Sequence, residues 1–184
     1  MESKKIVTIF GSSRPLEGDR QYEEARSLGV ELAKKGFTIC NGGYGGTMEA
    51  SSRGAKEQGG RTIGVVSRFF GKEANRWVDR KVEVQSLVDR LMELVSLADG
   101  YVVLKGGTGT LLELASVWEF MNKSVIEEKP LVVLGPSWNG VLDSLNRELE
   151  FEGNSACTRY ITVVPSPEKA AAYLAGRLLG TITL

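Results

Sequence analysis

The chain of 184 residues has no histidine, two cysteines and no excess charge, with 23 Lys plus Arg against 23 Asp plus Glu. The lack of histidine excludes Ser–His and Cys–His nucleophiles and histidine-ligated metal sites. It also removes the one side chain that titrates near neutrality without help from its surroundings. Any acid–base chemistry must therefore use Glu, Asp, Lys, Tyr, Cys or the backbone.

The other scarce features narrow the class of protein. Cys40 and Cys157 are far apart and follow no CxxC or metal-ligand spacing, so two reduced, buried thiols are expected. A zero net charge argues against a nucleic-acid or anionic-membrane partner, because both require a basic surplus. No apolar run approaches the roughly 18 residues of a membrane span, and residues 6–10 are too short for a signal peptide. We expect a cytoplasmic protein with a small-molecule partner, no metal and no cofactor.

Short apolar runs alternate with amphipathic stretches along the chain, and no linker or repeat interrupts them. The pattern predicts strands at residues 6–10, 37–40, 62–66, 100–104, 131–134 and 160–164, and helices at residues 19–35, 46–58, 86–98, 109–123, 137–148 and 167–179. Residues 67–84 have no clear period and are expected to form a long loop closing on an interface or ligand. Alternating strands and helices predict one α/β domain over residues 1–184, a doubly wound parallel sheet with helices on both faces.

Three unusual segments, at residues 11–15, 41–49 and 105–113, follow predicted strands. Ligands of open parallel sheets bind beyond the carboxyl ends of the strands, where glycines let main-chain N–H groups and a helix N-terminus approach an anion. We therefore predict a phosphate site; the alternative is that the glycines only permit tight turns. Neither glycine-rich loop completes a P-loop or a GxGxxG motif, which disfavours NTP hydrolysis and a standard dinucleotide site. The candidate binding residues are Gly11, Ser12, Ser13, Gly42, Gly43, Gly45, Gly46, Met48, Gly106, Gly107, Thr108, Gly109 and Thr110.

Two charged residues are candidates for chemistry. Glu113 follows one turn inside the helix that opens at the third loop, near any phosphate or sugar held there. An acidic residue that complements the helix dipole would occupy the same position. Arg90 falls on the preceding helix, where a surface arginine is the simpler interpretation.

The three segments resemble the Lonely Guy (LOG) family, also labelled "possible lysine decarboxylase". Its members share a GSS loop, a GGG-x-x-G-L-M-G loop and a PGG-x-G-T-x-x-E signature, matched here by residues 11–13, 42–49 and 105–113. The resemblance covers about residues 6–135 and implies a three-layer, Rossmann-like, usually dimeric fold. It also implies a phosphoribohydrolase, which releases the base from AMP or a cytokinin riboside monophosphate and leaves ribose 5-phosphate.

The resemblance also implies a catalytic pair. The number of residues between Arg90 and the first residue of the signature equals the spacing of the catalytic arginine in the family. Glu113 matches the glutamate that ends the signature. A carboxylate can stabilise the positive charge that develops on the sugar and orient a water, while an arginine holds the carboxylate or the substrate. Such a site would show no histidine-like inflection near about pH 6.5, and its acid limb would report Glu113 or the substrate phosphate.

Departures from the family pattern leave substrate and turnover open. Lys105 replaces the signature Pro, Glu49 replaces a Gly, and Arg90 lacks a following basic residue, a pattern closer to an uncharacterised bacterial branch. Lys105 either adds a phosphate contact or points into solvent, and Glu49 could alter which base or sugar fits. A molybdenum cofactor carrier shares the fold, so a non-catalytic nucleotide or phosphorylated-cofactor carrier is the alternative. No lysine stands out as a Schiff-base residue, which disfavours decarboxylation.

The helical stretches at residues 90–97 and 112–121 carry more apolar surface than one face requires, including Trp118 and Phe120. This surplus predicts a homodimer, and the family resemblance implies that its small-molecule partner is a nucleoside monophosphate.

Overall fold

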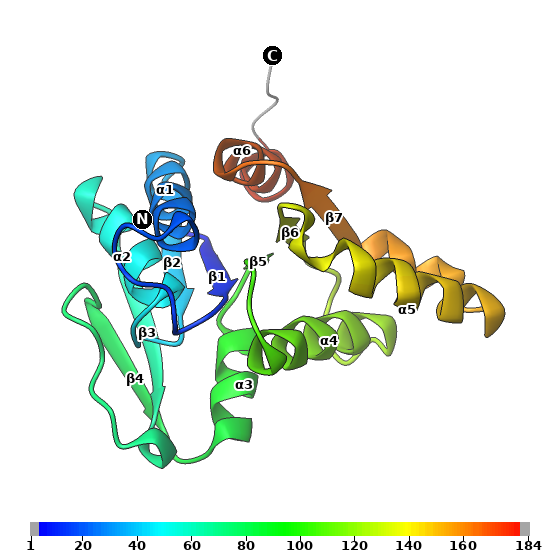
Figure 1. Ribbon diagram of the computed structural model, residues 1–184, viewed down its shortest axis with the longest axis horizontal. Coiled ribbons are helices and arrows are strands. Elements are labelled where there is room, and N and C mark those ends of the chain that lie inside the picture. The colour runs from blue at the N-terminus through cyan, green and yellow to red at the C-terminus, as the bar shows by residue number, and fades with distance from the viewer. Residues whose placement is uncertain (1–3, 181–184) are drawn as a thin grey trace.

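A single parallel sheet organises the chain. The computed structural model describes residues 4–180, so residues 1–3 and 181–184 of the predicted domain lie outside the described part. Within residues 4–180, seven strands form one sheet in the order β4-β3-β2-β1-β5-β6-β7, and all neighbouring strands are parallel (Figure 1). The predicted α/β fold is confirmed.

Strands and helices alternate as expected. The strands are β1 (Ile6–Phe10), β2 (Thr38–Asn41), β3 (Thr62–Ser67), β4 (Arg80–Val84), β5 (Gly100–Val103), β6 (Leu131–Leu134) and β7 (Ile161–Val164). The α-helices are α1 (Arg20–Lys34), α2 (Thr47–Glu57), α3 (Leu87–Ser96), α4 (Thr108–Asn122), α5 (Asn139–Phe151) and α6 (Pro167–Leu179). Three short 3₁₀ helices are η1 (Arg68–Phe70), η2 (Pro136–Trp138) and η3 (Ser155–Tyr160). Among the described helices, none combines the length and apolar character needed to cross a bilayer.

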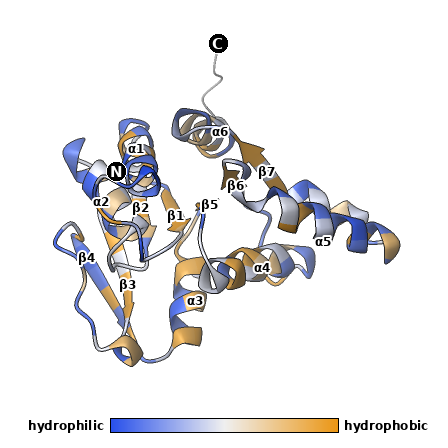
Figure 2. Cartoon of the chain, in the orientation of Figure 1, coloured by the Kyte–Doolittle hydropathy of each residue, from blue (hydrophilic) through white to orange (hydrophobic). Residues whose placement is uncertain are grey.

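The strand β4 corrects the expectation of a long loop over residues 67–84. It pairs with β3 from Arg80 to Val84 and forms one edge of the sheet. Val82 and Val84 are partly buried, whereas the charged residues Arg80, Lys81 and Glu83 are exposed, as is typical of an edge strand. Figure 2 shows this hydrophilic edge in blue beside the hydrophobic strand β3.

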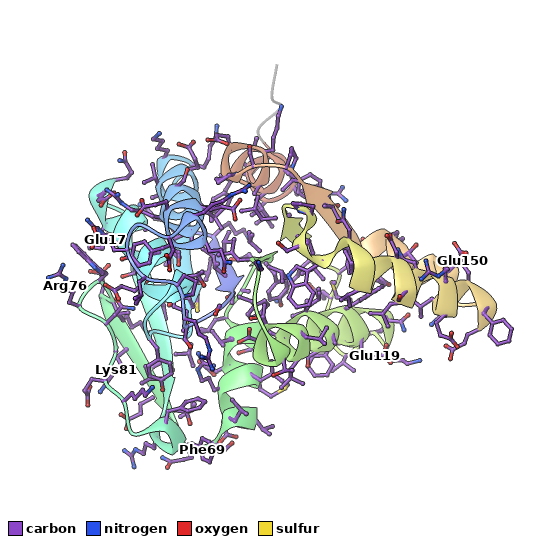
Figure 3. The ribbon with its side chains drawn as sticks, in the orientation of Figure 1. Glu17, Phe69, Arg76, Lys81, Glu119 and Glu150 are labelled. Atoms are coloured by element: carbon purple, nitrogen blue, oxygen red, sulfur yellow. The ribbon has the colours of Figure 1, made fainter. Side chains whose placement is uncertain are left out.

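Between β3 and β4 the chain turns through η1 and then crosses back over the glycine loop that follows β2. Phe69 lies at the outer tip of this turn, where 72% of its surface is exposed (Figure 3). Further along, Asn75 donates from its backbone N–H to the Gly43 carbonyl at 2.7 Å. The segment is therefore anchored to the second motif.

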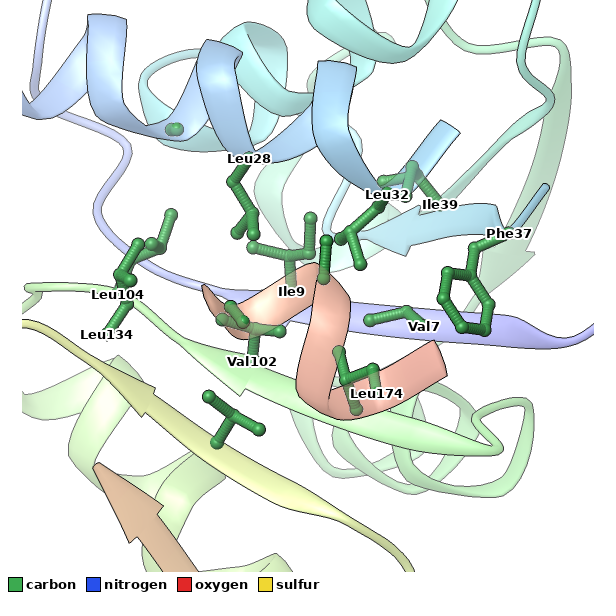
Figure 4. Packing of buried hydrophobic residues seen from close by; sticks show 14 of the residues in the cluster. Val7, Ile9, Leu28, Leu32, Phe37, Ile39, Val102, Leu104, Leu134 and Leu174 are labelled. Carbon is green, nitrogen blue, oxygen red and sulfur yellow. The ribbon is translucent and has the colours of Figure 1, made fainter. Parts of the chain in front are cut away.

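The two faces of the sheet carry separate apolar clusters, because successive strand residues point in opposite directions. Val7 and Ile9 of β1 pack with α1 and α6 on one face (Figure 4), and Phe10 packs with α3 and α4 on the other. The central strands are buried from both sides, which explains their nearly continuous apolar runs. Cys40 and Cys157 are both buried and unbridged, as predicted.

The order of the strands places a crevice beside β1. The chain builds outward from β1 to β4 and then returns through α3 to β5, which pairs with the other side of β1. At the ends of these two strands, the Leu104 N–H donates to the Phe10 carbonyl at 2.9 Å, and the segments that follow β1 and β5 then separate. Such a reversal of direction opens a ligand crevice at the carboxyl ends of the strands.

Two glycines let α1 and α2 approach closely. A Cβ at Gly29 would overlap the Ser51 carbonyl oxygen, and a Cβ at Gly54 would overlap the Arg26 carbonyl oxygen. Both obstacles are backbone atoms, which cannot move away without shifting a helix.

We predict that Gly54→Ala lowers the free energy of unfolding by about 1–3 kcal/mol, although alanine is the better helix former. Gly140→Ala in α5 is the matched control, because nothing lies within 4 Å of its Cβ position. That control should be neutral or stabilising by up to about 1 kcal/mol. Urea denaturation of both variants measures the difference, and equal stabilities would contradict the close approach of the helices.

Candidate functional site

The three motifs meet at a cleft of about 450 Å³ beyond the carboxyl ends of β1, β2 and β5. Arg90 from α3 and Glu113 from α4 both line it. The predicted binding residues that also line the cleft are Gly11, Ser12, Ser13, Gly42, Met48, Gly107, Thr108, Gly109 and Thr110. Residues more than 100 positions apart in the sequence thus share one cavity.

The first two motifs are locked to each other. Thr47, the first residue of α2, donates from its backbone N–H and from its hydroxyl to the Ser12 carbonyl, at 2.9 and 3.0 Å. Gly46 has a φ of 70°, and a Cβ there would overlap the backbone of Ser12 and Ser13. The N-terminus of α2 is consequently occupied by the GSS loop rather than open to a ligand.

Asn41, at the end of β2, holds the second loop in shape. Its buried side-chain amide donates to the Met48 carbonyl at 2.9 Å, and its side-chain oxygen accepts from the Gly43 N–H at 2.9 Å. The sequence analysis did not single out Asn41. A polar residue at the end of an otherwise apolar strand was the available signal.

The N-terminus of α4 is open at the cleft. Its cap residue Gly107 provides no side-chain hydrogen bond, whereas serine side chains cap α3 and α6. The first N–H groups of a helix have no intrahelical acceptor and carry a partial positive charge. Thr108 and Gly109 are exposed at the cleft, so a phosphate could bind these free donors.

Arg90 is buried beneath the second loop, so it is not a surface arginine. Its Nε donates to the Val65 carbonyl at 2.9 Å, and its guanidinium carbon lies 5.4 Å from the centre of the Tyr44 ring. A Cβ at Gly42 would overlap the guanidinium, so any other residue there would displace the Arg90 side chain. These contacts leave the Nη1 side of the group facing α4.

Glu113 is the carboxylate that faces Arg90. Its Oε1 is 3.9 Å from Arg90 Nη1, and the side chains of the arginine and the glutamate are 10% and 15% exposed. Glu113 lies beyond the first turn of α4, which holds no acidic residue, so it does not occupy the position of a dipole-complementing glutamate.

Burial raises the pKa of Glu113 from its ordinary value of 4.5 to about 7, although the Arg90 charge acts to lower it. The acid limb expected from Glu113 would therefore fall near pH 7, close to where a histidine titrates. A buried glutamate provides the near-neutral group that the missing histidine would otherwise supply.

Several residues of the cleft were not predicted. Arg14, Tyr44, Phe70 and Lys72 line it together with the motif residues. The Tyr44 hydroxyl accepts from the Ser67 N–H at 2.8 Å, and its ring meets Phe70 edge-on with centroids 5.6 Å apart. A tyrosine inside a glycine loop, and aromatic residues in an aperiodic segment, were the signals for this wall.

Some predicted residues do not line the cleft. Gly43, Gly45 and Gly46 shape the second loop instead, and the partly buried Glu49 also stands away from the cavity. Gly106 and the exposed Lys105 line a neighbouring cleft. Across residues 4–180, no cluster of three or more Asp, Glu or Cys side chains is arranged to hold a metal ion.

Comparison with known proteins identifies the family. Residues 4–170 match the model of the SLOG cluster4 family. The chain therefore belongs to this family. This assignment confirms the resemblance drawn from the three motifs.

Relatives of the SLOG cluster4 chain include proteins named for reactions of nucleoside monophosphates. A cytokinin riboside 5′-monophosphate phosphoribohydrolase of Mycobacterium marinum is 32% identical over 133 residues, which cover 71% of this chain and 70% of that protein. A pyrimidine/purine nucleotide 5′-monophosphate nucleosidase of Escherichia coli is 27% identical over 146 residues, which cover 73% of this chain and 32% of that longer protein.

Among solved structures, the molybdenum cofactor binding protein of Rippkaea orientalis superimposes with a TM-score of 0.76. The two chains are 23% identical, and the match covers 97% of this chain and 99% of the other. At that identity the likeness concerns the fold alone.

The raised pKa of Glu113 predicts a pH-dependent stability difference in the SLOG cluster4 chain. The folded state binds the Glu113 proton more tightly than the unfolded state, so ionisation lowers the stability of the fold. This cost is absent below the unfolded pKa, grows as the pH rises from 4.5 to about 7 and is constant above that. Glu113→Gln should thus be more stable than the wild type by up to about 3 kcal/mol at pH 8, and about equal to it at pH 4.

Chemical denaturation across this pH range measures the effect. Glu119→Gln, an exposed change on the same helix, serves as the control and should track the wild type at every pH. A Glu113→Gln difference that does not vary with pH would contradict the raised pKa.

Proposed function

We propose that the protein is a nucleoside 5′-monophosphate phosphoribohydrolase, which cleaves AMP or a cytokinin riboside monophosphate to a free base and ribose 5-phosphate. The observation that carries the proposal is Glu113, a buried carboxylate with a near-neutral pKa in the same cleft as an open helix N-terminus. The relatives named for reactions of 5′-monophosphates support the same substrate class.

The walls of the cleft suggest how such a substrate would be bound. The 5′-phosphate would accept hydrogen bonds from the free N–H groups at the start of α4, near Thr108 and Gly109. The ribose would then lie over Glu113, which is one to two turns further along the same helix. The apolar wall of Met48, Tyr44 and Phe70 would face the base.

Hydrolysis would begin as the bond between C1′ and the base nitrogen lengthens and positive charge develops on the ribose. The ionised Glu113 stabilises that charge and accepts a proton from the water whose oxygen bonds to C1′. The base leaves with the electron pair of the broken bond and takes up a proton. Arg90 holds the carboxylate in position and favours its ionised form.

Glu113→Gln should lower the rate of base release by about 10²–10⁴-fold, because the amide can neither accept the proton nor carry the charge. The assay incubates purified protein with AMP and with isopentenyladenosine monophosphate and measures free base by chromatography. Glu119→Gln is again the matched control and should keep full activity. Retained activity in a folded Glu113→Gln variant would remove Glu113 from the catalytic role.

The wild-type assay also separates the two classes of function. Binding of either nucleotide without release of base would favour a non-catalytic nucleotide or phosphorylated-cofactor carrier. Neither binding nor cleavage would contradict both functions.

We also propose that the protein acts as a homodimer through α3 and α4. Val88 and Met92 of α3 and Leu112 of α4 are exposed apolar residues on these adjacent helices, with Val88 67% exposed. Trp118, expected to add to this surface, is buried in the chain's own core, where its Nε1 donates to the Cys157 carbonyl at 2.9 Å. The proposed interface is therefore the N-terminal part of both helices.

Met92→Glu should shift the protein from dimer to monomer, because it buries a charge in the proposed interface. Sedimentation velocity at micromolar concentration measures the change. Phe151→Glu, at the exposed far end of α5, is the control and should leave the association state unchanged (Figure 1). A monomeric wild type would contradict the dimer.

A further inference from the structure

A second cleft, of about 730 Å³, adjoins the first at the same end of the sheet. It lies between the start of α1 and the loops that follow β5 and β6. Two residues of the third motif line this second cleft rather than the first. They are Gly106 and Lys105, the lysine that replaces the proline of the family signature. Its volume is in the usual range of small-molecule sites.

The second cleft has a cationic lining that the fold itself does not use. Arg14, Arg20 and Lys105 are exposed residues along its walls. In the described part of the chain, the ion pairs engage other residues and leave these three cations without a carboxylate partner. Exposed cations without a carboxylate partner are available to an anionic ligand.

Two acidic residues also line the second cleft, and one of them is engaged locally. Asp19 accepts a hydrogen bond from the Leu16 N–H at 2.8 Å and so belongs to the turn before α1. Glu24 is the second carboxylate. With three cations against these two carboxylates, the lining keeps a formal charge of +1.

The two clefts adjoin each other. Ser12 and Arg14 line both of them, and the third motif runs from Lys105 and Gly106 in the second cleft to Gly107 and Thr108 in the first. A phosphate at the N-terminus of α4 would therefore sit at the border between the clefts. A group attached to that phosphate would extend toward Lys105 and Arg20.

We propose that the second cleft is a subsite for a further phosphoryl group, so that the preferred ligand is a nucleoside 5′-diphosphate, either free or esterified at its outer phosphate. This inference rests on the proposed function, because it places the first phosphate at α4. Lys105 then has the role of a phosphate ligand, and Arg20 contributes a planar donor that suits phosphate oxygens. Binding of a second phosphoryl group would explain why residue 105 is a lysine where the family signature has a proline.

Titration calorimetry with AMP and with ADP, at one ionic strength, tests the subsite. The full-length chain carries Glu113→Gln to prevent turnover, and the titrations are repeated with the wild-type chain. We expect ADP to bind at least about tenfold more tightly than AMP, because hydrogen bonds between charged groups are among the strongest in proteins.

The double variant Arg20→Gln/Lys105→Gln should bring the ratio of the two affinities to within about threefold of one. Both residues are exposed, so these substitutions should leave folding intact. Arg61→Gln removes an exposed cation from the opposite end of the sheet and should leave the ratio unchanged.

If AMP is bound or cleaved but ADP binds no more tightly, or if the ratio is the same in the double variant, the subsite is wrong and the proposed function stands. If neither nucleotide binds, the subsite is wrong, and if isopentenyladenosine monophosphate is also neither bound nor cleaved, the proposed function is wrong as well.

Discussion

The buried guanidinium of Arg90 determines how the surrounding elements are arranged. It occupies the space that a side chain at residue 42 would need, and its Nε satisfies the carbonyl of Val65 in β3. A buried cation is costly unless it is paired and hydrogen-bonded, so the loop after β2 and the start of α4 must both stay close to it. One side chain from α3 thereby ties together β3, the glycine loop and the helix that carries Glu113.

The acid–base character of the site follows from two opposing effects on Glu113. Burial penalises the ionised carboxylate, whereas the positive charge of Arg90 favours it, and the pKa of about 7 means that burial has the larger effect. At 3.9 Å the pair is too long for a direct hydrogen bond, which leaves Glu113 free to exchange a proton with a ligand or a water. A protein without histidine can in this way carry a group that changes charge near neutral pH.

The sequence analysis predicted the parts of this arrangement that depend on short-range patterns. The strands buried on both faces, the three loops and the interval from Arg90 to Glu113 could all be found in the order of residues. The edge strand β4 was missed because three of its five residues are charged and only Val82 and Val84 face the core. Asn41 and the Tyr44–Phe70 wall were missed because their roles depend on contacts that only the folded chain creates. The adjacency of the two clefts likewise depends on the position of β1 beside β5, which no local pattern specifies.

The fold alone does not separate a hydrolase from a carrier, since a molybdenum cofactor binding protein shares it over 97% of this chain. The environment of Glu113 bears on that choice. Keeping a carboxylate in a cleft that raises its pKa destabilises the folded chain at neutral pH, and phosphate binding at α4 gains nothing from a nearby negative charge. A protein that only holds its ligand would be better served by a neutral residue there. A hydrolase, in contrast, would use the destabilising carboxylate to transfer a proton and to stabilise the positive charge that develops on the sugar. Carboxylates with perturbed pKa values concentrate at catalytic sites.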